Sequence, residues 1–320
     1  MSGHLPPEIQ ADHRRAVRLE YWTIAWMISV VALMGLVMGG SQAMRTAWIE
    51  DILSLVPAIV FLVAARFERK PPTRLFPFGY QRVHSFAFLI AAVALASVGT
   101  LLLFESVMTL VRQEHVTVPP VQIFGQEIWL GWLMIAALAY SVVPPVILGR
   151  KKLPLARRLQ DEVLHTDALM QRADWMTGLA GIAGILGLGL GYWWADAVAA
   201  GIISASILHD GTKALRIATA ELVDGTPRAL GEKEVDPEAQ QLIEKLEGQY
   251  PNARIRLRKT GRYIRAEVCG VEPDQEQDLE ALWPGDPERS WRLAQLSFVP
   301  PDNDARAGGS SVPSPPAELK

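Results

Sequence analysis

The chain divides into two unlike parts. Residues 1–222 contain six long apolar segments, whereas residues 223–320 are polar, charged and rich in proline. A helix of about 20 mainly apolar residues is long enough to cross a hydrocarbon layer of roughly 30 Å. The sequence therefore predicts an α-helical membrane protein with a small C-terminal domain, in which the six transmembrane helices span residues 20–40, 42–66, 84–110, 127–149, 163–191 and 195–222.

Basic residues predict how these helices are oriented. Lys and Arg crowd the connections 66–82 and 150–158, while the intervening connections contain few of them. Positive charge marks the cytoplasmic side of a membrane protein. We therefore expect an integral protein of a prokaryotic cytoplasmic membrane, with residues 1–19 as a cytoplasmic arm and with both termini in the cytoplasm.

Several kinds of protein are disfavoured by composition. Cys269 is the single cysteine, so the chain has neither an internal disulfide nor a Cys/His set for structural zinc. The apolar segments contain no paired nucleophile and base and no His-Glu-x-x-His motif. We expect no enzyme activity, no cofactor and no nucleic-acid partner.

Acidic residues inside the apolar segments indicate where function resides, because ionisable groups at membrane depth are rare and commonly mark ion pathways. Glu50 and Asp51 interrupt the second segment, and Asp174 interrupts the fifth. At 1.5 Å per residue, Glu50 and Asp174 each lie about 13 Å from a membrane surface. Ser54 shares the helix face of Glu50. Two carboxylates at one level would suit oxygen coordination of a divalent cation.

Other interpretations of these residues remain open. Asp174 could pair with Arg172 or Arg45 and serve only helix packing, and Asp51 could turn toward a serine or a backbone group. Met170, one turn before Asp174, fits core packing, although a thioether also binds soft metals. The glycines of the fifth segment predict close contact with a neighbouring helix.

Several motifs in order resemble one known family. They are Phe78-Gly79-Tyr80-Gln81-Arg82, Asp174, Trp194-Ala195-Asp196-Ala197, and the run from Leu222 to Pro227. These motifs are similar to those of the cation diffusion facilitators, which export divalent metals as homodimers. The resemblance covers most of the chain and implies a membrane-embedded transporter that works by alternating access, with the metal ion, protons and membrane lipid as its partners.

The resemblance also implies a metal site, with departures from the family pattern. The family's four ligand positions fall on Glu50, Ser54, Met170 and Asp174, where only two side chains are carboxylates. A shift of one residue would bring Asp51 forward in place of Glu50. The family's site histidine is missing, so zinc is not the default cargo, and Mn²⁺, Fe²⁺ or another divalent ion remains open. The rival interpretation is a transport-inactive membrane scaffold that retains the fold and the dimer.

The C-terminal part is expected to fold as a small α+β domain. Asp236 begins a helical pattern, residues 254–258, 263–268 and 292–299 alternate as strands, and the order αββ(α)β is similar to the family's cytoplasmic dimerisation domain. We assign residues 20–222 to the transmembrane domain, 223–301 to the dimerisation domain and 302–320 to a disordered tail.

Overall fold

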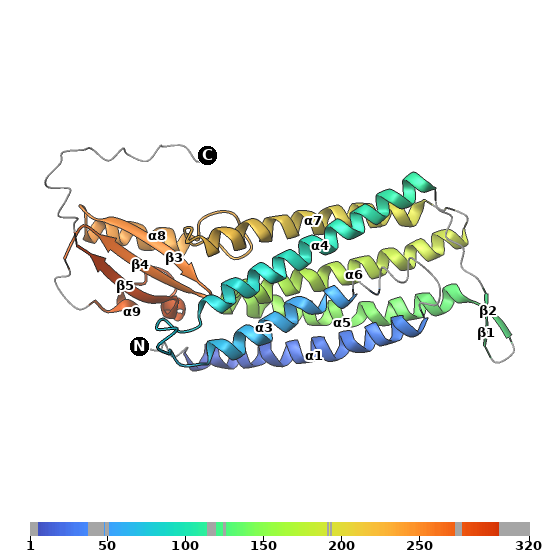
Figure 1. Ribbon diagram of the computed structural model, residues 1–320, viewed down its shortest axis with the longest axis horizontal. Helices are drawn as coiled ribbons and strands as arrows, with labels where there is room; N and C mark the ends of the chain where they lie inside the picture. Colours follow the sequence, from blue (N-terminus) through green and yellow to red (C-terminus); the bar gives the residue numbers. More distant parts are fainter. Residues whose placement is uncertain are drawn as a thin grey trace.

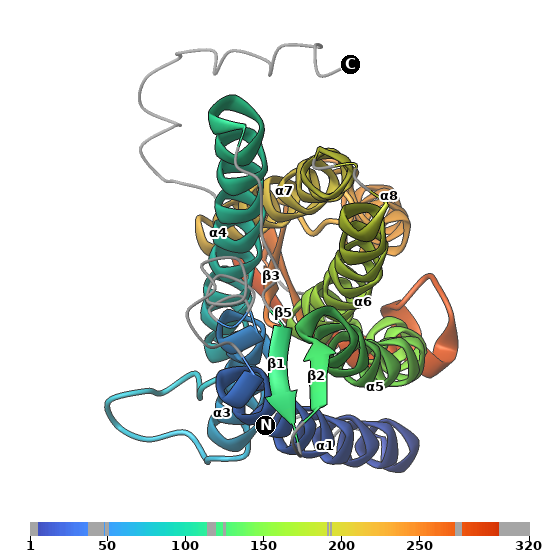
Figure 2. The ribbon, with the colours of Figure 1, turned by 90° about the vertical axis from the view of Figure 1, so that its right-hand side faces the viewer.

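A bundle of long helices lies beside a small sheet in the computed structural model (Figure 1). The structure describes residues 6–37, 48, 51–113, 120–123, 126–190, 192, 194–272 and 277–300. The bundle helices are α1 (Pro7–Val37), α3 (Leu55–Glu68), α4 (Arg82–Arg112), α5 (Leu130–Leu159), α6 (Glu162–Gly189) and α7 (Ala195–Leu222). An end-on view shows α4 beside α7 and α5 beside α6 (Figure 2).

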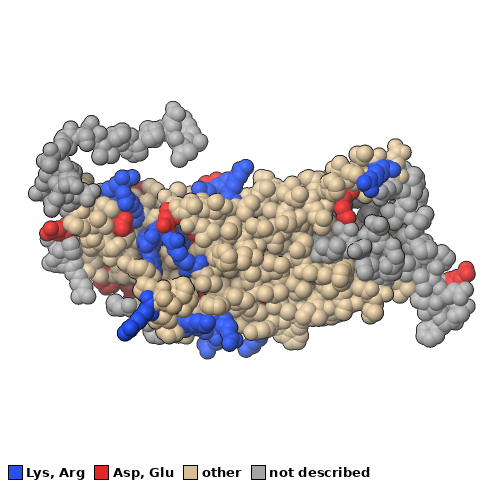
Figure 3. Space-filling view, viewed as in Figure 1, with Lys and Arg blue, Asp and Glu red and all other residues tan. Residues whose placement is uncertain are grey.

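The surface of the bundle agrees with a membrane protein. Three helical stretches in the described part are long and apolar enough to cross a membrane by length and composition, namely Pro7–Leu36, Arg82–Arg112 and Gly131–Leu159. On the face seen in Figure 3, charged side chains gather toward the two ends of the molecule and leave a broad uncharged band between them. An uncharged band flanked by charge is what a hydrocarbon layer requires.

Two helices extend beyond the predicted spans. Helix α1 begins at Pro7, so most of the segment expected as a polar arm is helical. Helix α5 continues to Leu159, and the prediction of a basic loop over residues 150–158 is therefore wrong. The reason is a helical burial pattern, because Lys152, Ala156 and Leu159 are buried at intervals of four and three residues while the arginines between them face outward.

Glycines in α6 allow it to lie close to α5, as the sequence predicts. A Cβ atom added at Gly178 would lie 2.5 Å from Cγ2 of Val142, and one added at Gly181 would lie 3.2 Å from Cδ1 of Leu138. Ordinary side chains at these positions would force the helices apart. Small residues at helix contacts are a general solution where apolar burial gives little drive for association.

The C-terminal domain contains α8 (Pro237–Gln249), β3 (Arg254–Thr260), β4 (Tyr263–Cys269), α9 (Leu279–Leu282), a short 3-10 helix (Pro287–Arg292) and β5 (Leu293–Val299). Strand β4 lies in the centre, antiparallel to β3 and parallel to β5. This order agrees with the predicted αββ(α)β arrangement. Leu242 and Leu246 of α8 pack on the sheet in a core with Ile264. Residues 301–320, predicted as a disordered tail, lie outside the described residues.

A small hairpin lies at the opposite end of the bundle (Figure 1). It consists of β1 (Pro120–Ile123) and β2 (Gln126–Trp129), which pair antiparallel. The sequence analysis did not predict it, because residues from 127 onward were assigned to the fourth span. Helix α5 in fact begins at Leu130, directly after β2.

Candidate cation-binding site

Ser54 lies directly before α3, which begins at Leu55. Residues 51–53 are helical, and Ser54 itself has right-handed helical backbone angles, φ −66° and ψ −13°. The Ser54 side chain does not cap its own helix. Its hydroxyl instead donates a hydrogen bond of 2.7 Å to Oδ1 of Asp174 on α6. This hydrogen bond places a hydroxyl group of the second segment against the predicted acidic residue.

Asp174 lies near the middle of α6 and is oriented toward the bundle interior. Its Oδ2 atom is buried and has no hydrogen-bond partner among the described residues. A carboxylate buried in low dielectric is unfavourable unless it is paired, protonated or bound to a cation. The unpartnered oxygen is thus a position where a proton or a metal ion would be stabilising.

Met170 is fully buried one turn before Asp174. It packs in an apolar cluster with Leu95 and Val98 of α4 and Ile207 of α7. These contacts are those of a core side chain. The structure thus places Met170 close to Asp174 along α6, packed within this apolar cluster.

Of the two acidic residues of the second segment, Asp51 belongs to the described part of the chain and Glu50 lies outside it. Asp51 is half-buried one turn before Ser54 and interacts electrostatically with Asp174. Within the described ranges, no group of three or more His, Cys, Asp or Glu side chains is arranged to hold a metal ion. The described part of the site is therefore one carboxylate and one hydroxyl, with the choice between Glu50 and Asp51 still open.

Arg172 does not close the site. Its guanidinium group lies 3.0 Å from Oδ2 of Asp210 on α7, and it forms this ion pair in place of the alternative pair with Asp174. Arg45, the other cation considered for Asp174, lies outside the described residues. The alternative prediction, in which Arg172 forms an ion pair with Asp174, is therefore wrong.

A second buried polar group lies on the same helix as Asp174, nearer the C-terminal domain. The Nζ atom of Lys152 on α5 donates 2.8 Å to Glu20 of α1 and also contacts Asp167 of α6, and all three side chains are fully buried. Sequence reasoning missed this group, because Lys152 was assigned to a basic loop and Glu20 to the end of a polar arm. The spacing of Lys152, Ala156 and Leu159 was the signal that could have indicated a buried position.

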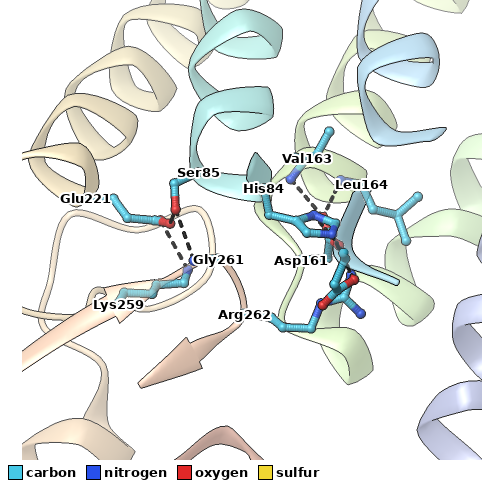
Figure 4. A network of polar contacts seen from close by, with 10 residues as sticks. His84, Ser85, Asp161, Val163, Leu164, Glu221, Lys259, Gly261 and Arg262 are labelled. Atoms are coloured by element: carbon cyan, nitrogen blue, oxygen red, sulfur yellow. Dashed lines mark hydrogen bonds and ion pairs between the residues drawn. The ribbon is translucent and has the colours of Figure 1, made fainter. Parts of the chain in front are cut away.

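The hairpin between β3 and β4 inserts into the end of the bundle (Figure 4). Arg262 is 1% exposed and its Nη2 lies 3.0 Å from Asp161 and 3.3 Å from Glu68. Lys259, also buried, lies 2.9 Å from Glu162 and 3.7 Å from Glu221. Two buried cations of the C-terminal domain are thus matched by four carboxylates of the bundle.

Gly261 allows the close approach at this hairpin. Its φ angle is +62°, and a Cβ atom there would lie 2.7 Å from the carbonyl oxygen of Gln81. Its backbone N–H donates 3.0 Å to the Ser85 hydroxyl, which in turn donates to Glu221 (Figure 4). A left-handed glycine is therefore required for the contact between the two parts of the chain.

Acid pH is expected to weaken this contact through Glu68. Burial by itself raises the pKa of the Glu68 carboxyl, but Arg262 and His84 beside it hold the pKa well below its ordinary value. The resulting stabilisation is present above the unfolded pKa of about 4.3 and is lost as the pH falls toward the lower folded pKa. When the pH is lowered below about 4, the melting temperature of Glu68→Gln should therefore decrease by less than that of the wild type. The exposed Glu247→Gln is the control, and equal acid sensitivity in all three proteins would contradict the expectation.

The apolar helices and the buried polar residues define a class of protein, an integral membrane protein with ionisable groups inside its helical bundle. The comparisons with known proteins specify the family. A model of the cation efflux transmembrane domain matches residues 21–223. The chain thus belongs to the cation efflux, or cation diffusion facilitator, family.

Two relatives extend the similarity beyond this domain. A protein named as a probable cation efflux system protein in Mycobacterium tuberculosis (strain CDC 1551 / Oshkosh) is 24% identical over 244 residues, which cover 76% of this chain and 68% of the relative. The manganese efflux system protein MneS of Bacillus subtilis (strain 168) is 23% identical over 228 residues, which cover 71% of this chain and 73% of MneS. Both names refer to cation efflux, in agreement with the family.

Proposed function

We propose that this protein exports a divalent metal ion by alternating access around Asp174, in exchange for protons. The observation that carries the proposal is the buried Asp174 carboxylate, with one oxygen held by Ser54 and the other without a partner in the described part of the chain. An uncompensated carboxylate between helices is a natural binding point for a cation that crosses the membrane.

The available ligand atoms favour a hard cation. Asp174 and Ser54 offer oxygen, and the acidic residue that completes the set, Glu50 or Asp51, would also offer oxygen. Oxygen ligands suit Mn²⁺, whereas thiolates and imidazoles favour Zn²⁺ and softer ions. The name of the relative MneS points to the same metal. We therefore propose Mn²⁺ as the first cargo to test, with Fe²⁺ and Zn²⁺ as the alternatives.

The same carboxylate would carry the exchanged proton. The ligand positions contain no histidine, the usual group that titrates near neutral pH. Burial favours the protonated form of a carboxyl group, so Asp174 could hold either a proton or a cation. The Ser54 hydroxyl can donate to Asp174 or, after rotation, offer a lone pair to a bound metal. Both states then use the same two side chains.

The orientation and assembly belong to this proposal. On the face seen in Figure 3, Lys and Arg are concentrated toward the end of the molecule that contains the C-terminal domain, as expected for the cytoplasmic side. Helix α1 begins at this same end (Figure 1). We place both termini in the cytoplasm of a prokaryotic cell and propose a homodimer that pairs through the C-terminal domain.

Flux measurements test the proposed function. Purified full-length protein would be reconstituted into liposomes, and uptake of Mn²⁺, Fe²⁺, Co²⁺, Ni²⁺, Zn²⁺ and Cd²⁺ would be recorded with and without a pH gradient. Saturable uptake that responds to the gradient is expected, with Mn²⁺ among the fastest ions. Absence of uptake for every ion would support the transport-inactive scaffold, and uptake insensitive to the gradient would contradict proton exchange.

Ser54→Ala tests the contribution of the hydroxyl group. The variant should raise the KM for Mn²⁺ by about tenfold, because a hydrogen bond to a charged group contributes roughly 1.5–3 kcal/mol. Ser204→Ala is a matched control, since the buried Ser204 hydroxyl donates to the carbonyl oxygen of Gly201 on its own helix. An unchanged KM in Ser54→Ala would remove Ser54 from the binding set.

A further inference from the structure

One face of α6 forms a mainly polar column. Asp167, Met170, Gln171 and Asp174 follow one another at helical spacings of three, one and three residues, so they share one side of the helix. Asp167, Met170 and Gln171 are buried, and Asp174 is half-buried with its Oδ2 atom enclosed. Asp167 and Asp174 are seven residues apart, or about 10 Å at 1.5 Å per residue. The column therefore extends from the Ser54–Asp174 pair toward the end of the bundle that adjoins the C-terminal domain.

Gln171 is the unexplained member of this column. Its side chain is fully buried, yet neither its Oε1 nor its Nε2 atom has a hydrogen-bond partner among the residues the structure describes. It faces α5, because a Cβ atom added at Gly149 would lie 3.2 Å from Cβ of Gln171. An apolar side chain of similar size would fill this position without leaving a buried amide unsatisfied. The amide thus indicates a polar ligand or water between the helices.

The group around Lys152 adds two carboxyl groups one helical turn away from the contact between Gln171 and Gly149. Lys152 is three residues beyond Gly149 on α5 and is held by Glu20 and Asp167. Two buried carboxyl groups therefore share one ammonium group. Oε1 of Glu20 and Oδ1 of Asp167 are buried without a partner in the described ranges. These two oxygens are additional acceptor positions for a cation.

We propose that Glu20, Asp167 and Gln171 form a second, inner cation-binding station between the Ser54–Asp174 site and the C-terminal-domain end of the bundle. The Lys152 ammonium group is its resident cation and gives way when a divalent cation enters. The unpartnered oxygens of Glu20, Asp167 and Gln171 are hard ligands suited to a partly hydrated divalent ion such as Mn²⁺. The inference rests on the proposed transport function and specifies the route to its site.

The spacing of the column supports a transfer between two stations. A cation at Asp167 and one at Asp174 would be separated by about two helical turns. Gln171 lies between them, so its amide oxygen can accompany the ion across the gap. Ion pathways that bind and release rapidly use several weak sites in place of one deep site.

Two variants test the station in the full-length protein in liposomes. Gln171→Leu removes the amide at similar volume, and Glu20→Gln removes one of the two carboxyl groups while leaving Lys152 paired with Asp167. Each should lower the initial rate of Mn²⁺ uptake by about tenfold, the lower end of the loss seen when a group that supports a bound metal is removed. Gln171→Leu should also raise the melting temperature, because a buried unpaired amide is lost. The control is Thr177→Val, since the Thr177 hydroxyl bonds its own helix at Ala173.

The outcomes separate this inference from the proposed function. If the wild type takes up no cation, the proposed function fails. Suppose that the wild type transports Mn²⁺ and that Gln171→Leu has a higher melting temperature with an unchanged initial rate of uptake. Gln171 then has only a packing role, and the proposal of an inner station is overturned. Full uptake by Glu20→Gln would overturn it as well. Loss of rate in both variants, with Thr177→Val unchanged, is the result that the inner station requires.

Discussion

Replacement of Asp174 by Asn is expected to lower the initial rate of metal uptake by on the order of a hundredfold or more, because removing even a group that supports a metal ligand costs 10–100-fold. The change removes the negative charge and the exchangeable proton from the site while preserving the shape of the side chain. Its amide oxygen can still accept the hydrogen bond from Ser54, which is 2.7 Å long in the wild type. Proteoliposome uptake of Mn²⁺ is the measurement.

Stability separates loss of function from loss of fold in this variant. Asp174→Asn should melt at or above the wild-type temperature, because it removes an uncompensated buried acid. Asp174→Glu keeps the charge and should retain measurable uptake. Wild-type uptake by a folded Asp174→Asn protein would contradict the assignment of Asp174 as the central ligand.

Replacement of Arg262 by Gln is expected to destabilise the contact between the bundle and the C-terminal domain by about 3–5 kcal/mol, the usual penalty for removing one partner of a buried ion pair. The guanidinium group is 1% exposed and lies within 3.3 Å of both Asp161 and Glu68. Without it, the two buried carboxylates lose their guanidinium partner and keep His84, at 3.0 Å from Glu68 and 3.6 Å from Asp161, as a basic neighbour. Thermal unfolding of the full-length protein in detergent, with hydrogen exchange of β3 and β4, would detect the loss.

Arg256→Gln is the matched control for Arg262. Like Arg262, Arg256 lies next to a carboxylate, but it is on strand β3, its side chain is 56% exposed and its pair with Glu267 is 3.6 Å long. Surface pairs of this kind contribute about 0–1 kcal/mol. Similar destabilisation by the two variants would mean that burial of Arg262 at the domain contact does not stabilise the fold.

The central features of the site could be predicted from sequence. Acidic residues inside apolar segments are rare and commonly mark ion pathways, and Asp174 could be selected on that basis from the sequence alone. The helical rise placed Glu50 at a depth comparable to that of Asp174, and Ser54, which shares the helix face of Glu50, donates a hydrogen bond to Asp174. The strands of the C-terminal domain were likewise visible from alternation and from the turn at Gly261.

The buried ion pairs could not be predicted, for a physical reason. A lysine in a basic run, such as Lys152, is ordinarily solvated, and only its partners Glu20 and Asp167 from distant segments make burial tolerable. Arg262 gave no local signal either, because its partners come from the ends of α3 and α6. Pairings of this kind depend on which helices are neighbours.

The most direct test of the account is to locate the cation in the purified protein. Crystals of the wild type soaked in Mn²⁺ should give an anomalous diffraction peak at coordination distance from Oδ2 of Asp174 and close to the Ser54 hydroxyl, and the peak should vanish in Asp174→Asn. A transport-competent wild type that binds Mn²⁺ elsewhere in the bundle, with Asp174 still bonded only to Ser54, would contradict the central claim.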